Sequence, residues 1–382
     1  MNADELSLEG LVAVAMSGGV DSAVAAALLV RQGVPTVGVT LRIWPSRRPA
    51  DPGERFDSCC SPAAVDDARA AAAALGIRHY VLNYEAEFDR EVVGYFTAAY
   101  LAGETPNPCV PCNARLKFGS LLERARGWGA ARVATGHYAR IGRDPVSGRH
   151  LLRRGADPRK DQSYFLYGLS QAQLGAALFP VGHLRKEETR RIAAELGLGV
   201  AGKADSQEVC FAPRDYRPYL RERAGEGIAP GIIRDSAGTV RGEHRGLALY
   251  TVGQRRGLGL GNPRPLYVID LDPATNEVVV GEDRDLWTRE VRVEALNWIV
   301  IPFLEAPRRV LAKIRYAQAA AAATVAPAAA GAVALTFEAP QRAVAPGQAA
   351  VFYDAADPEL VVGGGTIRRR APADGAPGRE GA

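Results

Sequence analysis

The stretch Leu11-Val-Ala-Val-Ala-Met-Ser-Gly-Gly-Val-Asp-Ser22 decides the fold. Leu11 to Met16 is a short apolar run, which is typical of a buried parallel strand. Asp21 to Gln32 is rich in alanine and has apolar residues at helical spacing. The Ser-Gly-Gly between them lets the backbone turn tightly, and the following helix start offers free N–H groups and a positive dipole end. The stretch therefore predicts a phosphate-binding turn between a strand and a helix.

Strand and helix patterns continue to alternate beyond this turn. Further strands are expected at Thr36–Ile43, His79–Leu82 and Arg132–His137. Further helices are expected at Ala63–Leu75, Phe88–Leu101 and Arg115–Arg126. This alternation predicts an α/β fold with a doubly wound parallel sheet that binds ligands at the carboxyl ends of its strands.

The composition and the pattern of the sequence change in the second half. From about Arg217, Gly and Pro become frequent and β-like runs replace helices, and a second change comes near Val291. Strand patterns occur at Leu247–Val252, Leu266–Leu271, Glu277–Gly281, Val310–Tyr316, Ala332–Phe337, Ala349–Tyr353 and Val361–Thr366, with strand and loop expected in Ala317–Ala330. We expect an α/β domain at 1–215, a small central domain at 216–290, a C-terminal β-barrel at 291–370 and a disordered tail at 371–382.

Composition narrows the class of protein. The chain has 382 residues, of which 47% are hydrophobic, and its formal net charge is +4. Five cysteines exclude a disulfide scaffold and favour a reducing compartment. The N-terminus has no signal-peptide pattern, and no apolar run reaches the roughly 18 residues that a membrane span needs. We expect a cytoplasmic protein without membrane association, and a monomer.

The loop Ser17 to Ser22 has no Walker-type lysine, so it is not a P-loop. Its SGGVDS sequence resembles that of the PP-loop ATP pyrophosphatases. The resemblance implies cleavage of ATP between the α and β phosphates and adenylation of a substrate oxygen. The loop by itself leaves the acceptor open.

The cysteines narrow the choice of acceptor. Cys109 and Cys112 form a CxxC in a Pro-rich loop, which is compatible with a metal site, a redox disulfide or a nucleophile. We expect Cys112 near the start of a helix from about Asn113, where the helix dipole favours the thiolate. Cys210 lies in a separate segment, Asp205-Ser-Gln-Glu-Val-Cys-Phe211. Two thiols beside an adenylating loop suggest sulfur transfer through a persulfide.

The order of several motifs makes the resemblance specific. TPNP, CN, KF, ATGHYAR, KDQSYFL, DSQEVCF, TVGQRRGLG, RY and PGQ follow one another across nearly the whole chain. Together they resemble the tRNA-specific 2-thiouridylases of the MnmA family. The resemblance implies a sulfurtransferase that makes 2-thiouridine at C2 of the wobble uridine, position 34, of tRNA, through adenylation of O2 and a cysteine persulfide.

The family's residues can be transferred to matching positions in this chain. By resemblance, Cys112 is the nucleophile and Cys210 the persulfide carrier, and the two form a transient disulfide. The implied ATP contacts are Ala15, Met16, Ser17, Gly18, Gly19, Val20, Asp21, Ser22, Leu41 and Gly136. The implied contacts with the target base are Asn107, Pro108 and Cys109, and those with tRNA are His137, Lys160, Asp161, Gln162, Arg315, Tyr316 and Gln348.

The same resemblance implies the ligands and partners. ATP is bound with Mg²⁺, and no protein side chain is expected as a metal ligand. The partners are tRNA and a sulfur donor such as a cysteine desulfurase or a sulfur-relay protein. Dispersed arginines could contact RNA phosphates or form a solvated face; they are Arg140, Arg153, Arg154 and Arg159.

Cys109 departs from the family pattern. Some members have at this position an acidic residue proposed to assist acid–base chemistry, so Cys109 is either a spectator or a second thiol that pairs with Cys112. Cys59 and Cys60 could join the CxxC in a four-thiolate metal site, although adjacent cysteines suit tetrahedral binding poorly. Asp205 and Glu208 could tune the Cys210 thiol.

Three other functions compete with the leading one. Another PP-loop adenylating ligase, such as an amide-forming synthetase, would need no cysteine. A non-catalytic tRNA-binding protein would not turn over ATP. An iron–sulfur-dependent tRNA thiolase would use the CxxC together with Cys210.

Overall fold

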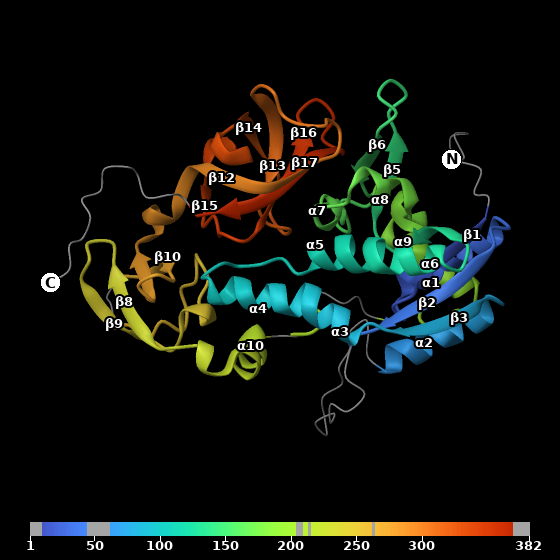
Figure 1. The fold of residues 1–382 in the computed structure, drawn as a ribbon, viewed down its shortest axis with the longest axis horizontal. Helices are drawn as coiled ribbons and strands as arrows, with labels where there is room; N and C mark the ends of the chain where they lie inside the picture. The colour runs from blue at the N-terminus through green and yellow to red at the C-terminus, as the bar shows by residue number, and fades with distance from the viewer. Residues whose placement is uncertain (1–9, 44–61, 204–208, 213–214, 262–263, 370–382) are drawn as a thin grey trace.

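Three structural parts follow one another along the chain (Figure 1). The computed structural model describes residues 10–43, 62–203, 209–212, 215–261 and 264–369. An α/β part with a parallel sheet comes first, a small four-stranded part follows, and a closed barrel comes last. The predicted α/β class with a central domain and a C-terminal β-barrel is therefore confirmed.

A five-stranded parallel sheet forms the centre of the first part. In the order in which they pair, its strands are β3 (Arg78–Asn83), β2 (Thr36–Arg42), β1 (Leu11–Ala15), β4 (Ala130–Ala134) and β7 (Ala177–Leu178). The chain moves from β1 outwards to β3 and then crosses to β4 on the other side of β1. The carboxyl end of β1 therefore lies at the switch point of the sheet, where open α/β folds bind ligands.

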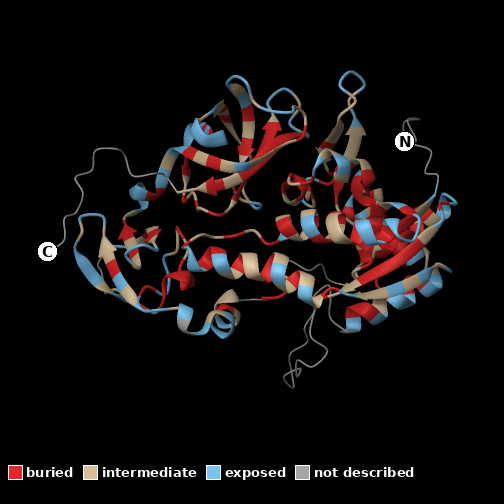
Figure 2. Cartoon of the chain, viewed as in Figure 1, coloured by how far each residue is buried: buried red, intermediate tan, exposed pale blue. Residues whose placement is uncertain are grey.

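Helices cover both faces of this sheet, as a doubly wound fold requires. Val12 and Val14 of β1 pack on one face with α1 (Val20–Arg31), α2 (Pro62–Ala74) and α9 (Lys186–Glu195). Ala13 faces the other side, because successive residues of a strand point to opposite faces. Figure 2 shows the buried core that results between the helices and the sheet.

Two long helical segments lie on the Ala13 side of the sheet. The first consists of α3 (Glu85–Phe88), the π-helical η1 (Asp89–Val93) and α4 (Gly94–Leu101). The second consists of α5 (Cys109–Pro111), the π-helical η2 (Cys112–Ser120) and α6 (Leu121–Arg126).

Both segments begin earlier than the predicted starts at Phe88 and Arg115. For the second segment, prolines favoured a loop in the prediction. A proline is tolerated in a first helical turn because its missing N–H has no intrahelical acceptor there, and Pro111 lies in that turn. Cys112, expected near the start of a helix from about Asn113, is the fourth residue of a segment that begins at Cys109.

A hairpin leaves the first part and joins the barrel. Its strands β5 (Ala139–Arg143) and β6 (His150–Arg154) pair with each other, and β6 pairs with barrel strand β17. This hairpin was not predicted. The remaining helices are α7 (Ser163–Leu166), α8 (Gln171–Ala176), α10 (Tyr216–Ala224), η3 (Pro180–His183) and η4 (Gly225–Gly227).

The central part is a small mixed sheet. In pairing order its strands are β10 (Tyr267–Asp272), β11 (Glu277–Gly281), β8 (Gly231–Asp235) and β9 (Val240–His244). The predicted strand at Leu247–Val252 is wrong, because the chain makes the 3₁₀ turn η5 (Leu247–Leu249) there. Both leucines are buried in the core of this part, and an apolar run can be buried in a turn as well as in a strand.

Six antiparallel strands close the C-terminal barrel. They are β12 (Trp287–Trp298), β15 (Val333–Arg342), β14 (Ala321–Pro327), β13 (Arg308–Lys313), β16 (Ala349–Asp354) and β17 (Leu360–Arg368). Pairing of β12 with β17 completes the circle, so neither strand is a free edge along that stretch. The 3₁₀ turns η6 (Asp283–Leu286) and η7 (Ala329–Gly331) complete the elements. None of the helices in the described part of the chain has the length and apolar character to span a bilayer.

Candidate active site

The turn between β1 and α1 can only be built with a glycine at position 18. Gly18 has φ +68°, and a Cβ there would lie 2.1 Å from the backbone oxygen of Ala64. Ser22 Oγ accepts a hydrogen bond from Ser17 N at 3.1 Å and donates one to Gly19 O at 3.1 Å. These contacts hold the turn folded back over the first residues of α1.

The start of α1 is open to an anion. Gly19 is the residue before the helix, and no side chain caps the helix start. The first N–H groups of an α-helix have no intrahelical acceptor, so they are available to a ligand. Gly136 passes close by, because a Cβ on it would lie 2.6 Å from Ser22 N.

Two lysines that sequence reasoning did not select flank this turn. Lys186 is buried and donates to both carboxylate oxygens of Asp21, at 2.7 and 2.9 Å. Tyr138 also donates to Asp21, at 2.8 Å. Lys203 donates to Gly18 O at 3.2 Å and to Asp67 Oδ2 at 2.6 Å. The turn without a Walker lysine thus has two lysines beside it that come from distant segments.

The other predicted ATP contacts surround the carboxyl ends of β1 and β2. Ala15 ends β1, and Met16 is buried directly after it. Leu41 lies near the end of β2 and packs against the large core. These residues lie at the carboxyl edge of the parallel sheet, where open α/β folds bind ligands.

The CxxC forms the first turn of a helix. Asn107 Oδ1 accepts a hydrogen bond from Cys109 N at 3.2 Å, which fixes the turn at Pro108. Cys109 is exposed and Cys112 is half-buried. Residues three apart lie on the same face of a helix, so the two cysteines are neighbours one turn apart.

Cys210 lies in the segment that leads to α10. It is half-buried and packs, like Cys112, against the large core of the first part. The next residue, Phe211, is buried and makes edge-to-face contacts with Phe88 at 5.6 Å and Phe96 at 5.0 Å. Aromatic packing therefore anchors the Cys210 segment on the helix that precedes the CxxC.

Burial and a nearby lysine affect the histidine that follows Gly136. His137 follows Gly136, and its Nδ1 lies 2.6 Å from Thr135 Oγ1. Burial, reinforced by the nearby charge of Lys117, holds the pKa of His137 well below its usual range. Lys117 in turn donates to Asn113 Oδ1 at 3.0 Å, in the helix that carries Cys112. Burial and the neighbouring positive charge both disfavour the protonated imidazole.

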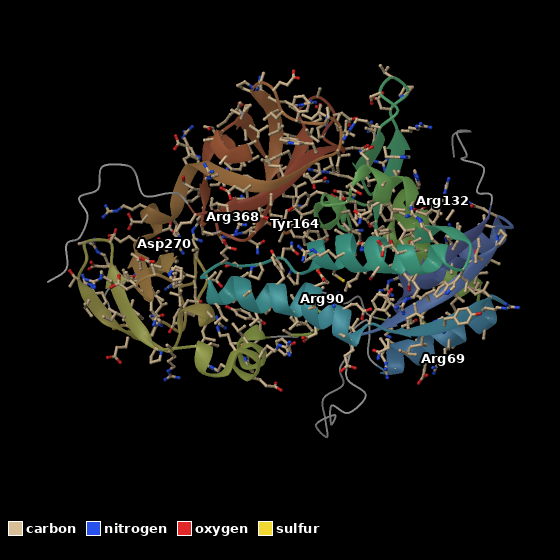
Figure 3. The ribbon with its side chains drawn as sticks, in the orientation of Figure 1. Arg69, Arg90, Arg132, Tyr164, Asp270 and Arg368 are labelled. Atoms are coloured by element: carbon tan, nitrogen blue, oxygen red, sulfur yellow. The ribbon has the colours of Figure 1, made fainter. Side chains whose placement is uncertain are left out.

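Two of the predicted tRNA segments, the KDQSYFL motif and Arg315–Tyr316, meet through aromatic rings. Phe165, in the KDQSYFL motif, and Tyr316 have ring centroids 4.5 Å apart. The carbonyl of Phe165 also accepts a hydrogen bond from Asn113 Nδ2 at 3.1 Å. We call the contact region between the first part and the barrel the seam. Figure 3 labels one residue from each side of it, Tyr164 in the first part and Arg368 in the barrel.

Gln348 lies at the same seam. Its Nε2 donates to Thr105 O at 2.9 Å, and Thr105 N donates to Pro346 O at 2.7 Å. A loop of the barrel therefore holds in place the chain segment that leads to Asn107. Arg315 reaches the backbone oxygen of Ala343, in the same part of the barrel.

The Lys160–Asp161–Gln162 segment makes mostly internal contacts. Asp161 is buried and accepts from Gly155 N, Ser163 N and Ser163 Oγ at 3.0 to 3.2 Å. Gln162 Oε1 accepts from Tyr138 N at 3.0 Å. Lys160 is half-buried. These contacts give Asp161 and Gln162 a part in shaping the loop beneath the seam.

The four dispersed arginines all have partners within the chain. Arg140 pairs with Glu359 at 2.8 Å, Arg153 with Asp357 at 2.8 Å and Arg159 with Glu187 at 2.6 Å. The Arg154 guanidinium lies 3.9 Å from the ring centroid of Tyr353. These contacts therefore join separate segments of the chain, while the arginines keep their polar groups near the surface.

Some predicted residues lie outside the described residues: Cys59, Cys60, Asp205, Glu208 and the tail 371–382. Among the described residues, no group of three His, Cys, Asp or Glu side chains is arranged to hold a metal ion.

Comparisons with known proteins cover nearly the whole chain. Family models match at residues 10–214 (tRNA methyl transferase HUP domain), 218–282 (tRNA methyl transferase PRC-barrel domain) and 288–367 (Aminomethyltransferase beta-barrel domain). A relative named tRNA-specific 2-thiouridylase MnmA from Moorella thermoacetica is 53% identical, over 93% of this chain and 98% of its own length. Relatives of the same name from Symbiobacterium thermophilum and Heliobacterium modesticaldum are 51% and 52% identical, each over 94% of this chain and 92% of their own length.

Similarity to solved structures is weak. NMN synthetase from Francisella tularensis is 20% identical, covers 57% of this chain and 86% of its own, and gives a TM-score of 0.32, which carries no argument. The identity and coverage of the curated relatives decide the matter: the chain belongs to the family of tRNA-specific 2-thiouridylases.

Proposed function

We propose that this chain uses ATP to convert the wobble uridine of tRNA, position 34, to 2-thiouridine. The observation that carries the proposal is that Cys112 and Cys210 pack against the same buried core as Ala15 and Leu41, which lie at the carboxyl ends of β1 and β2 beside the uncapped start of α1. A site suited to a triphosphate and two thiols therefore belong to one part of the fold. Two of the matching family models are described as tRNA methyl transferase domains, whereas the full-length relatives at about half identity are named 2-thiouridylases.

ATP fits the turn at Ser17–Ser22. Gly19 leaves room at the start of α1, since a Cβ there would find only Ser17 Oγ, at 3.6 Å. The uncapped N–H groups of α1 would hold phosphate oxygens. Mg²⁺ would enter with ATP and neutralise its phosphates, while Lys186 and Lys203 supply further positive charge nearby.

The chemistry proposed at uracil needs both activation and sulfur delivery. O2 of uracil attacks the α-phosphorus of ATP and pyrophosphate leaves, which turns O2 into part of a good leaving group. Cys210 carries a terminal sulfur as a persulfide, taken from a sulfur donor such as a cysteine desulfurase or a sulfur-relay protein. That sulfur attacks C2, and AMP leaves with the former O2.

The electrons balance through the second cysteine. As the terminal sulfur goes to C2, the Cys112 thiolate attacks the inner sulfur of the Cys210 persulfide, so a Cys112–Cys210 disulfide forms. A dithiol reductant then restores both thiols. Cys112 lies in the first turn of its helix, where the dipole favours the thiolate.

The seam between barrel and first part is the proposed place of the tRNA. Asn107 and Pro108 lie beside the CxxC, and Tyr316 offers a partly exposed ring, 39% accessible, on which a base could stack. An anticodon uridine is already in a loop, so turning it into a pocket costs little. A cytoplasmic location and a monomeric state belong to the same proposal.

The test is formation of 2-thiouridine by purified protein. Wild type, Cys112→Ser, Cys210→Ser and the neighbouring control Cys109→Ser are incubated with unmodified tRNA, ATP, Mg²⁺ and a persulfide donor. Nucleosides are then measured by mass spectrometry. We expect the Cys112 and Cys210 variants to lose at least about a hundredfold in rate while Cys109→Ser stays active. Full activity of either of the first two would overturn the persulfide mechanism and favour a ligase that needs no cysteine.

The second candidate is an iron–sulfur-dependent thiolase, which would require three cysteines to come together, since no group of three among the described residues is arranged to hold a metal ion. Cys109 and Cys112 are one turn apart, and Cys210 packs on the same core as Cys112. Cysteine thiolates are the usual ligands of such clusters. In that case Cys109→Ser would lose activity together with the other two variants. Iron analysis and visible absorbance of anaerobically purified protein would decide between the two candidates.

A further inference from the structure

The motif TVGQRRGLG is one of those that carry the family resemblance, but it has no part in the proposed chemistry. Its residues form a loop between η5 and β10, in the central part of the chain. We propose that the loop 253–261, here called the Gly-Arg loop, binds the phosphate backbone of tRNA. This inference rests on the proposed function and extends the RNA surface beyond the seam, to a part of the molecule with no assigned role.

The base of the Gly-Arg loop is rigidly held. Gln254 Oε1 accepts from Thr251 N at 3.2 Å, and Gln254 Nε2 donates to Arg256 O at 2.9 Å. Backbone hydrogen bonds also join Gly253 N to Val268 O at 2.8 Å and Val268 N to Gln254 O at 2.9 Å. One glutamine side chain therefore fixes the turn and orients the backbone of the two arginines.

The top of the loop presents hydrogen-bond donors that have no acceptor in the part of the chain that the structure describes. Arg255 and Arg256 are exposed, and neither guanidinium has an ion-pair or hydrogen-bond partner among the described residues. Within the same described part of the chain, the backbone N–H groups from residue 255 to residue 261 donate to no acceptor. Gly257 and Gly259 have φ of +77° and +70°. Left-handed residues next to right-handed ones turn successive N–H groups toward one side, which is how loops bind anions.

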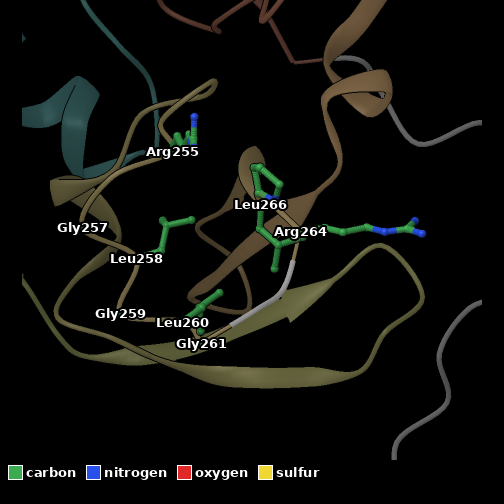
Figure 4. A pocket seen from close by; sticks show the side chains of 9 residues that line it. Arg255, Gly257, Leu258, Gly259, Leu260, Gly261, Arg264 and Leu266 are labelled. Atoms are coloured by element: carbon green, nitrogen blue, oxygen red, sulfur yellow. The ribbon is translucent and has the colours of Figure 1, made fainter.

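A cavity lies against this loop (Figure 4). It has a volume of about 420 Å³ and is lined by Arg255, Arg264 and the side chains of Leu258, Leu260 and Leu266. Arg264 pairs with Glu282 at 3.3 Å at its edge. The loop itself contains two arginines and no acidic residue. A basic rim with free N–H donors is complementary to the phosphates of a nucleic acid.

The position of the loop indicates which polyanion it meets. A Cβ on Gly253 would lie 2.8 Å from the Cβ of Ala343 and 4.0 Å from a guanidinium nitrogen of Arg315. Arg315 and Tyr316 are predicted tRNA contacts, and Tyr316 packs on Phe165 at the seam. The base of the loop therefore lies next to the barrel segment that carries these predicted tRNA contacts. Its occupant is the tRNA whose anticodon enters the seam.

The test compares tRNA binding at several salt concentrations. The double variant Arg255→Ala/Arg256→Ala removes two charges from the loop. Its control, Arg69→Ala/Arg191→Ala, removes two exposed charges from α2 and α9, where each pairs within its own helix. Filter binding with unmodified tRNA is measured from about 0.05 to about 0.3 M KCl.

We expect the loop variant to bind about tenfold more weakly at ~0.1 M salt, and its plot of log K against log salt to be shallower by roughly 1.4 to 1.8, while the control keeps the wild-type slope. Arg255→Lys/Arg256→Lys should recover most of the slope. Equal melting temperatures will show that all variants fold. Wild-type affinity and slope in the loop variant would overturn this inference alone, whereas a wild type that neither binds tRNA nor makes 2-thiouridine would overturn the proposed function.

Discussion

Gly18 shows how much one backbone position can constrain a site. Its neighbour across the turn is the backbone oxygen of Ala64, at the start of α2, which cannot rotate away as a side chain would. The residue also has positive φ, which disfavours any side chain. Both restrictions arise from packing of the turn against α2. The phosphate turn and the second helix are therefore built as one unit.

Replacing Gly18 by alanine should destabilise the fold without any ligand being present. We expect Gly18→Ala to lower the free energy of unfolding by about 2 to 4 kcal/mol, through the clash and the strained φ. Gly19→Ala is the matched control, because its Cβ would find ordinary contact and its φ is −100°. We expect it to cost less than about 1 kcal/mol. Urea unfolding followed by circular dichroism measures both, and equal costs would contradict the argument.

Lys203 connects several elements of the first part through hydrogen bonds. Its ammonium group joins Gly18 O, in the phosphate turn, to Asp67, in α2. The backbone oxygen of Lys203 accepts from Arg190 of α9 at 3.0 Å. Lys203 is also seven positions before Cys210. The start of the chain segment that carries the thiol is thus attached to the triphosphate site.

Removing this tie should loosen the thiol segment more than the whole fold. The Lys203 and Asp67 side chains are 33% and 41% exposed, so the pair contributes at most about 1 kcal/mol to stability. We expect Lys203→Met to raise the alkylation rate of Cys210 severalfold, with little change in melting temperature. Asp67→Asn, which keeps the bond to Gly18, should have a smaller effect. Mass spectrometry of iodoacetamide-treated protein gives the rates, with Cys112 as internal reference, and an unchanged Cys210 rate in Lys203→Met would refute the tie.

The elements also show which features the sequence could predict. β1, the phosphate turn and α1 follow from local patterns: an apolar run, two glycines and a helical period. β11 was predicted at its observed bounds, Glu277–Gly281. The pairing of β6 with β17 joins residues about 200 positions apart, and no local period encodes such a partner. The bond from Lys186 to Asp21 was missed for the same reason.

For the candidate site, the motifs selected residues but not their contacts. Sequence placed Asp161 and Gln348 among the residues that touch tRNA, and this stays a prediction. The structure adds that Asp161 is buried under backbone donors and that Gln348 holds Thr105. Such contacts depend on the docking of the barrel on the first part. They could not be derived from the spacing of residues in either part.

At the scale of the whole molecule, the barrel and the first part share a hydrophobic core. Tyr167 and Leu169, from the first part, lie in the same buried cluster as Ile299, Val351 and Val361, from the barrel. A core that contains residues of both parts loses packing in both when either opens. The seam is therefore a structural interior as well as the proposed place of the tRNA.

Hydrogen bonds add to this shared core. Asn297 Nδ2 donates to Tyr167 O at 2.6 Å and to Leu169 O at 2.9 Å. The Arg149 guanidinium donates to Ile299 O at 2.8 Å, from the hairpin that extends the barrel sheet. The two parts should consequently unfold together, rather than as separate domains joined by a linker.

This cooperativity can be measured with two single-tryptophan proteins. One keeps Trp128, beside Tyr80 at the edge of the parallel sheet, and the other keeps Trp298, which packs on Phe352 in the barrel. We expect the same urea midpoint from both fluorescence signals. Asn297→Ala should reduce the free energy of unfolding by about 1 to 3 kcal/mol, because it leaves two carbonyls at the seam without their donor. Both urea midpoints should therefore fall by the same amount. Two separate midpoints, or a shift seen by Trp298 alone, would mean that the barrel opens independently of the first part.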